Sequence, residues 1–208
     1  MINYFNYDYE KPASGQPFGV TTEIIDCPWN EEAKLLSIGI QAEDMDYSSL
    51  PNSNLVFLLD VSGSMESPDK LPLMVQAFQL LSEHLTENDT ISIVTYAGSD
   101  EILLEGVHGD NKRYIVETLE NLTASGSTNG SSGINTAYSL AEKYFIKGGN
   151  NRVILATDGD LNVGITSEGD LKKLIEQKRE SGIYLSVLGF GTENIKDNKM
   201  ETLADNGN

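Results

Sequence analysis

Hydrophobic positions follow two different patterns on either side of about residue 50. Before it, short alternating runs over residues 21–25 and 35–42 predict two strands around the turn-rich Pro28-Trp29-Asn30. After Pro51 there are continuous apolar runs without alternation, over residues 55–59, 91–97, 153–156 and 184–190. Such runs are typical of parallel strands that are covered on both faces. The pattern predicts a small β-rich extension over residues 1–50 and a second domain over residues 51–208.

Helical periods lie between the apolar runs of the second domain. Apolar side chains spaced by three and four residues predict helices over residues 73–81, 134–145 and 171–178, marked by Leu73, Ala77, Leu80, Leu81, Ile134, Ala137, Tyr138, Ala141, Phe145, Leu171, Leu174 and Ile175. Residues 102–107 fit a further strand, as an antiparallel edge. Strands that alternate with helices predict an α/β fold, a doubly wound and mostly parallel sheet with helices on both faces.

Charge and cysteine content restrict the function. The chain has 14 basic and 32 acidic residues and a formal net charge of −18, which repels nucleic acid and attracts cations. It has no run of 18 apolar residues, so we expect no membrane span within it. Cys27 is the only cysteine, which excludes internal disulfides and cysteine-based zinc sites.

Acidic and hydroxyl side chains follow two of the buried runs. Asp60 ends the first run, and Asp158 follows the run that begins at Val153. Ligands of open α/β sheets bind beyond the carboxyl ends of the strands. If the two strands are neighbours, Asp60 and Asp158 lie within a few ångströms, where two carboxylates repel unless a proton or a cation intervenes.

Hard oxygen donors surround these two carboxylates in the sequence. Ser62 and Ser64 follow Asp60, and Thr128 lies in a Gly- and Ser-rich loop before a predicted helix. An extended stretch after Asp60 would place both serines on one side, with Gly63 allowing a tight turn. A site of oxygen donors without His or Cys favours Mg²⁺, or else Mn²⁺ or Ca²⁺, over zinc.

These motifs, Asp60-x-Ser62-x-Ser64, Gly126-Ser127-Thr128 and Thr157-Asp158-Gly159, resemble the metal-ion-dependent adhesion site of von Willebrand factor type A (VWA) domains. The resemblance covers about residues 51–208. It implies that Ser62, Ser64 and Thr128 contact the metal, while Asp60 and Asp158 support it directly or through water. The segments Asn3-Tyr4-Phe5-Asn6-Tyr7 and Cys27-Pro28-Trp29-Asn30 are similar to a bacterial subgroup, the YfbK-like proteins. The family gives a slight preference for the cell envelope or an extracytoplasmic location.

The C-terminal part departs from the family pattern. Family members usually have a sixth strand and a C-terminal helix, and movement of that helix can couple to the metal site. Here the last predicted strand ends near Phe190, and residues 200–204 read as a helix. The VWA domain is therefore either truncated at its C-terminal edge or short of an edge strand, which leaves helix-coupled switching open.

The function expected from these residues is binding without catalysis. One divalent cation would coordinate an acidic side chain presented by a partner protein. A metal-dependent hydrolase, such as a phosphatase, is the alternative, and a metal-free scaffold is a third hypothesis. Hydrolysis requires a base or a cation beside the substrate. His84 and His108 do not follow strand ends that face the cluster, and Lys70 at a helix start is expected to be solvated.

Overall fold

The computed structural model describes residues 7–43, 50–126, 132–159, 167–192 and 197–208 of the 208-residue chain. The chain separates into two compact units, Met1–Leu50 and Pro51–Asn208.

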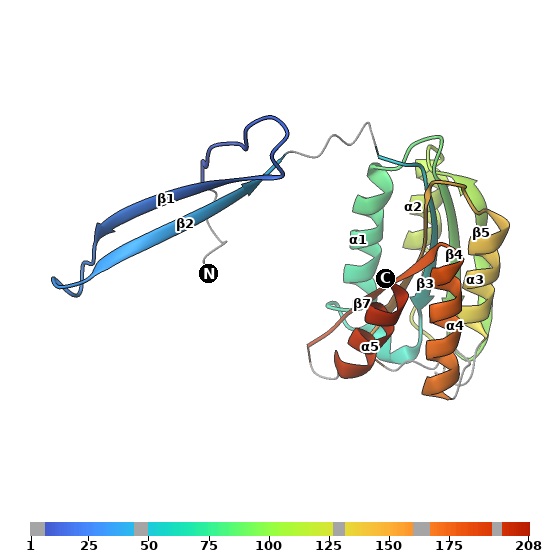
Figure 1. Ribbon diagram of the computed structural model, residues 1–208. Coiled ribbons are helices and arrows are strands. Elements are labelled where there is room, and N and C mark those ends of the chain that lie inside the picture. The colour runs from blue at the N-terminus through green and yellow to red at the C-terminus, as the bar shows by residue number, and fades with distance from the viewer. Residues whose placement is uncertain (1–6, 44–49, 127–131, 160–166, 193–196) are drawn as a thin grey trace. The chain divides into compact units, whose positions relative to one another are not determined.

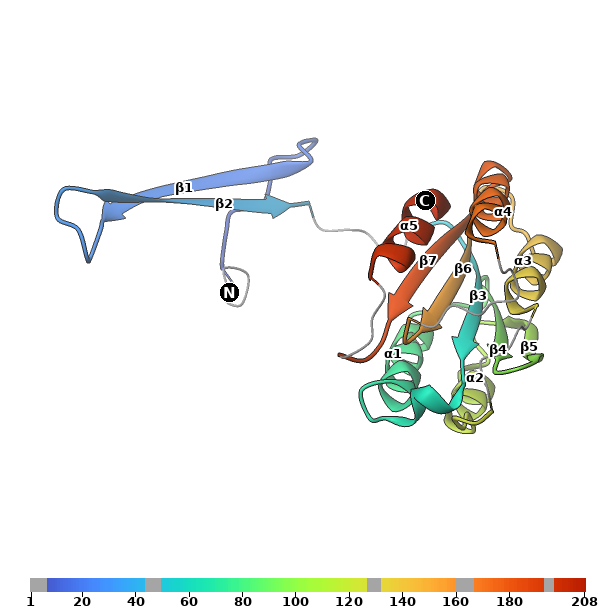
Figure 2. The same cartoon turned by 90° about the horizontal axis from the view of Figure 1, so that it is seen from below.

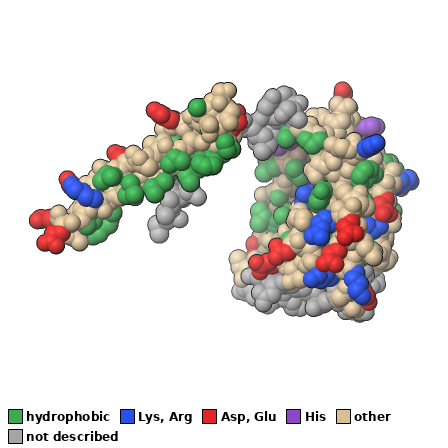
Figure 3. Space-filling view, in the orientation of Figure 1, with side chains coloured by type: hydrophobic (Ala, Val, Ile, Leu, Met, Phe, Trp, Pro, Cys, Tyr) green, Lys and Arg blue, Asp and Glu red, His purple; other side chains and the backbone are tan. Residues whose placement is uncertain are grey.

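The first unit is a β-hairpin. Strands β1 (Phe18–Asp26) and β2 (Lys34–Ala42) pair antiparallel along their whole length, from Phe18 opposite Ala42 to Asp26 opposite Lys34. The Tyr9 ring lies over one face against Gly39, where any larger residue would collide with the ring. The other face carries apolar side chains that are each more than half exposed, namely Phe18, Val20, Ile24, Leu36, Ile38 and Ile40 (Figure 3). Among the described residues, neither cluster of buried apolar side chains includes a residue of this hairpin.

The second unit contains a five-stranded sheet in the order β5-β4-β3-β6-β7 (Figure 1). Strands β3 (Ser53–Asp60), β4 (Thr90–Tyr96), β6 (Asn150–Thr157) and β7 (Ile183–Gly189) run parallel, and β5 (Asp100–His108) pairs antiparallel at one edge. The sheet confirms the predicted fold class, including the antiparallel edge strand.

Helices cover both faces of this sheet (Figure 2). Helices α1 (Leu71–Glu83) and α2 (Lys112–Glu120) lie on one face, and α3 (Gly133–Lys143), α4 (Glu168–Glu180) and α5 (Asp197–Gly207) lie on the other. Because side chains alternate along a strand, β3 serves both layers. Leu55, Phe57 and Leu59 pack with α1 and α2, whereas Val56 and Leu58 pack with α3 and α4.

Two helices differ from their prediction. The apolar stripe predicted for α1 was wrong, since Leu73 and Leu80 are exposed and the buried positions include Met74 and Phe78. The Phe78 ring centroid lies 4.3 Å from that of Phe57 in β3. The α1 segment has apolar residues on more than one side, so periodicity alone did not select its buried face. Helix α2 was not predicted, because only Ile115 and Leu119 of its nine residues are buried.

The carboxyl ends of the parallel strands lie together along one border of the sheet, the carboxyl edge, and the opposite border is the amino edge. After β3 the chain enters a short 3-10 helix, η3 (Gly63–Glu66), and then α1. The next described helix after β7 is α5, which packs on the sheet through Met200 and Leu203. Within the residues that the structure describes, no helix is long and apolar enough to cross a membrane.

Candidate metal centre

Strand register brings the predicted acidic residues to one edge. Strand β3 lies between β4 and β6, with Asp60 opposite Tyr96 on one side and Leu59 opposite Ala156 on the other. Thr157 is the last residue of β6, and Asp158 follows it. Because β3 and β6 are neighbouring parallel strands, Asp60 at the end of β3 and Asp158 after β6 come to the same border of the sheet.

The Asp60 carboxylate is fully buried and held by neutral donors. Its Oδ1 accepts a hydrogen bond from the Ser62 backbone N–H at 3.0 Å. Its Oδ2 accepts from the Tyr96 hydroxyl and from the Thr157 hydroxyl, both at 3.2 Å. These bonds fix the orientation of the carboxylate without a positive charge from any of the three donors.

Burial sets the protonation behaviour of this group. Loss of hydration raises the pKa of Asp60 above its ordinary value, and the negative charge of Asp158 raises it further. The hydroxyl and the backbone N–H of Ser62 lower the pKa of Asp60 but do not cancel the effect of burial. Burial also raises the pKa of Tyr96 well above its ordinary value, so its hydroxyl stays protonated as a donor to Asp60. An ionised Asp60 is therefore costly in the protein alone.

The two serine hydroxyls lie side by side. Ser62 Oγ is 3.1 Å from Ser64 Oγ; Ser62 is buried and Ser64 is exposed. Ser62 has the extended conformation predicted after Asp60, but the prediction was wrong from Gly63 on, because Gly63 begins the 3-10 helix η3. The Met65 N–H donates to the Ser62 carbonyl at 2.9 Å and closes that turn. A tight helical turn therefore brings the two hydroxyls together.

The Gly- and Ser-rich loop that contains Thr128 begins at the same carboxyl edge, with Ser125 and Gly126 bonded to the chain after β3. Ser125 N–H donates to the Val61 carbonyl at 2.8 Å, and the Gly126 carbonyl accepts from the Gly63 N–H at 3.3 Å. Gly126 has φ +83°, and a Cβ there would lie 3.2 Å from the Ala97 carbonyl oxygen, so glycine is required. Thr128 lies outside the described residues.

Lys70 makes a contact that the sequence did not indicate. Its Nζ lies 2.9 Å from Asp158 Oδ2 and 3.0 Å from the Ser64 carbonyl oxygen. The two charged side chains are only 18% and 6% exposed. The expectation that Lys70 is solvated at a helix start was therefore wrong, because its amine is directed back into the carboxyl edge.

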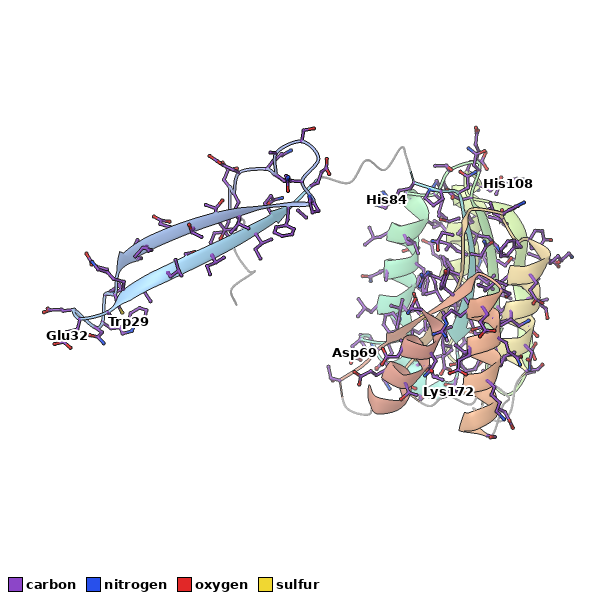
Figure 4. The ribbon with its side chains drawn as sticks, in the orientation of Figure 1. Trp29, Glu32, Asp69, His84, His108 and Lys172 are labelled. Atoms are coloured by element: carbon purple, nitrogen blue, oxygen red, sulfur yellow. The ribbon has the colours of Figure 1, made fainter. Side chains whose placement is uncertain are left out.

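The donor set at this edge fits a hard divalent cation. It combines two buried carboxylates with two adjacent hydroxyls, which are oxygen ligands of the kind that Mg²⁺ and Mn²⁺ accept. In the described ranges no three side chains of the types His, Cys, Asp and Glu gather as a metal cluster, so the hydroxyls are essential to such a site. His84 and His108 lie at the opposite edge of the sheet (Figure 4). A zinc site built on either histidine at this edge is excluded.

A comparison with known families agrees with this architecture. The von Willebrand factor type A domain matches residues 54–208, and a second match, described as von Willebrand factor, covers residues 1–37. The chain belongs to the VWA domain family, whose members are general protein-interaction and adhesion modules.

One bacterial relative is similar over the whole chain. The protein YfbK of Escherichia coli (strain K12) is 45% identical over 215 residues, covering 100% of this chain and 37% of the relative. The resemblance to the YfbK-like proteins is thereby confirmed. The chain spans little more than a third of the length of that relative.

Solved structures of low sequence identity share the fold. A von Willebrand factor type A protein from Catenulispora acidiphila has a TM-score of 0.60 at 18% identity, over 99% of this chain and 46% of that one. Manganese-loaded TRAP from Plasmodium vivax has a TM-score of 0.59 at 19% identity, over 74% of this chain and 63% of that one.

Proposed function

We propose that this chain binds one divalent cation, Mg²⁺ or Mn²⁺, at the carboxyl edge of its sheet and uses it to bind an acidic group of a partner protein. Ser62, Ser64 and Thr128 would contact the ion, and Asp60 and Asp158 would support it directly or through water. Ca²⁺ is a third candidate ion for the same oxygen donors.

The fully buried Asp60 carries this proposal. A buried carboxylate is costly unless a cation or strong donors compensate it, and its three described partners are all neutral. The hydroxyls of Ser62 and Ser64 follow it closely in the chain and lie 3.1 Å from each other. A cation held by these two hydroxyls would neutralise the carboxylate behind them. TRAP from Plasmodium vivax, which shares the fold, is loaded with manganese in its crystal structure, and this supports such chemistry on a VWA domain.

The chemistry of the donors indicates the kind of partner. Serine and threonine hydroxyls are neutral, so an ion that they hold keeps much of its positive charge toward solvent. The chain as a whole is strongly negative, with a formal net charge of −18. An acidic side chain would therefore be attracted to this one edge and repelled elsewhere, which favours one orientation of the partner.

Titration calorimetry tests the metal site. Protein freed of metal with EDTA is titrated with MgCl₂ and with MnCl₂, for the natural sequence, Asp60→Asn and Ser64→Ala. We expect one binding site per chain that is lost in Asp60→Asn and weakened in Ser64→Ala. The matched control is Asp69→Asn, an exposed carboxylate (Figure 4), which should bind as the natural sequence does. A hundredfold excess of metal over its dissociation constant should also stabilise the fold by about 2.7 kcal/mol.

The same variants separate binding from hydrolysis. A hydrolase would turn over a generic phosphoester in a metal-dependent manner, and Asp60→Asn would abolish that turnover. The interaction module that we propose gives no turnover above the metal-containing buffer. It instead binds acidic peptides in Mg²⁺ and releases them in EDTA. Metal binding that is equal in all four proteins would contradict the proposed site.

A further inference from the structure

Lys70 links three segments around the proposed metal centre. It precedes α1, its Nζ bonds Asp158 after β6 at 2.9 Å, and it also bonds the carbonyl of Ser64 in η3 at 3.0 Å. The Asp158 side chain is 6% exposed and that of Lys70 is 18% exposed, so the pair is shielded from water. Shielding makes this ion pair stronger than pairs on the open surface.

The loop after β7 leaves space for the Lys70 side chain. Gly191 has φ +93°, a conformation that favours glycine, and a Cβ at this position would lie 2.8 Å from Lys70 Cε. The aliphatic part of Lys70 therefore runs over a backbone that approaches it closely. This packing directs the amine toward Asp158 rather than toward solvent.

From this geometry we propose that Lys70 is a tethered counter-ion of Asp158 that competes with the divalent cation and sets its affinity. The inference rests on the proposed metal site. A cation supported by Asp158 shares that carboxylate with the Lys70 amine, and two positive charges at one carboxylate repel each other.

Removing the charge of Lys70 should destabilise the metal-free state of the site and favour its metal-bound state. Without metal, Asp158 loses its ion pair with Lys70 while the repulsion between Asp158 and Asp60 remains, so the metal-free protein becomes less stable. With metal, one source of repulsion is gone. The backbone bonds of Met65 to Ser62 and of Gly63 to Gly126 do not involve Lys70 and continue to hold the loop. Affinity for the cation should therefore rise.

The test compares Lys70→Met, which keeps most of the apolar stem but removes the amine, with Lys70→Arg, which keeps the charge. Titration calorimetry with MgCl₂ and MnCl₂ and thermal melting in EDTA are measured for both variants and for the natural sequence. We expect Lys70→Met to bind Mg²⁺ about tenfold more tightly and to melt at a lower temperature in EDTA. Lys70→Arg should stay within a few-fold of the natural affinity.

A double variant tests whether Lys70 stabilises the metal-free protein through its charge on Asp158 or only through the packing of its side chain. If Lys70 acts through Asp158, then Lys70→Met should lower the melting temperature in EDTA much less in an Asp158→Asn background. Unchanged or weaker metal binding in Lys70→Met, with normal binding by the natural sequence, overturns the inference about Lys70 alone. Absence of metal binding by the natural sequence itself overturns the proposed function.

Discussion

Buried polar side chains occur at both edges of the central sheet, but they are compensated in different ways. At the amino edge, Asp89 accepts backbone hydrogen bonds from Ser53 at 2.7 Å and Thr86 at 2.6 Å, and a third bond from the Thr86 hydroxyl. Asn151 bonds both the N–H and the carbonyl of Ile146 at 2.8 Å. These side chains replace missing backbone partners and fasten loops to the strands.

At the carboxyl edge the same kinds of side chain leave oxygen atoms available. Asp60 is held by one backbone N–H and two hydroxyls, and the hydroxyls of Ser62 and Ser64 face each other. A hydroxyl oxygen has two acceptor positions, so the pair can still contact a cation. The comparison indicates that burial of a polar residue does not by itself identify a site. The difference lies in the balance of partners: Asp89 accepts two of its three bonds from backbone N–H groups, whereas Asp60 accepts two of its three from side-chain hydroxyls.

The largest effect that we expect from this comparison is at the amino edge. Asp89→Ala removes a buried carboxylate and leaves the N–H groups of Ser53 and Thr86 without their acceptor, at hydrogen bonds that are partly buried, which should destabilise the fold by about 3 kcal/mol. Urea unfolding measures this loss. Asp110→Ala, at an exposed neighbouring acid, is the control and should change stability by less than about 0.5 kcal/mol. Metal affinity should be unchanged in both, and a loss of affinity in Asp89→Ala would show that the two edges are not separate.

A smaller effect of opposite sign is expected at the carboxyl edge. Because the folded pKa of Asp60 is raised, the metal-free protein binds a proton there more tightly than the unfolded chain does. Its stability should therefore fall as pH rises from the ordinary carboxyl range through the raised folded pKa. Asp60→Asn removes this charge and should make the metal-free protein more stable at neutral pH by about 1 kcal/mol.

Urea unfolding in EDTA between pH 4 and pH 8 checks the sign. The two proteins should converge at the acidic end and separate at the neutral end. Saturating Mg²⁺ should reverse their order, since only the natural sequence gains from the cation. If Asp60→Asn is the less stable protein in EDTA at every pH, the charge of Asp60 is compensated within the protein and needs no ion.

The fold and part of the site could be predicted because their signals are local. Apolar runs of four to seven residues identify strands buried on both faces, and their ends locate Asp60 and Asp158. That these two residues meet still depends on β3 and β6 being neighbours, which the sequence allowed but did not establish. A tight turn at Gly63 was expected, but the 3-10 helix that follows it was missed, because residues that favour a turn can also continue a strand.

Other features depend on contacts between distant segments. Lys70 and Asp158 are 88 residues apart in the chain, and no local pattern relates them. The buried side of α1 is selected by Phe57 of β3, since apolar residues on several sides of the helix allow more than one orientation. Helix α2 has only two buried positions, too few for a periodic signal. Each of these features is set by tertiary packing, which is why the local sequence patterns did not predict it.

Crystals grown with MnCl₂, measured near the manganese absorption edge, give the most direct test of the central claim. We predict one strong anomalous peak per chain, about 2.2 Å from both Ser62 Oγ and Ser64 Oγ, with Lys70 moved away from its contact with Asp158. An anomalous map without a peak between these two hydroxyls, or with peaks only at exposed carboxylates, would contradict the proposed metal centre.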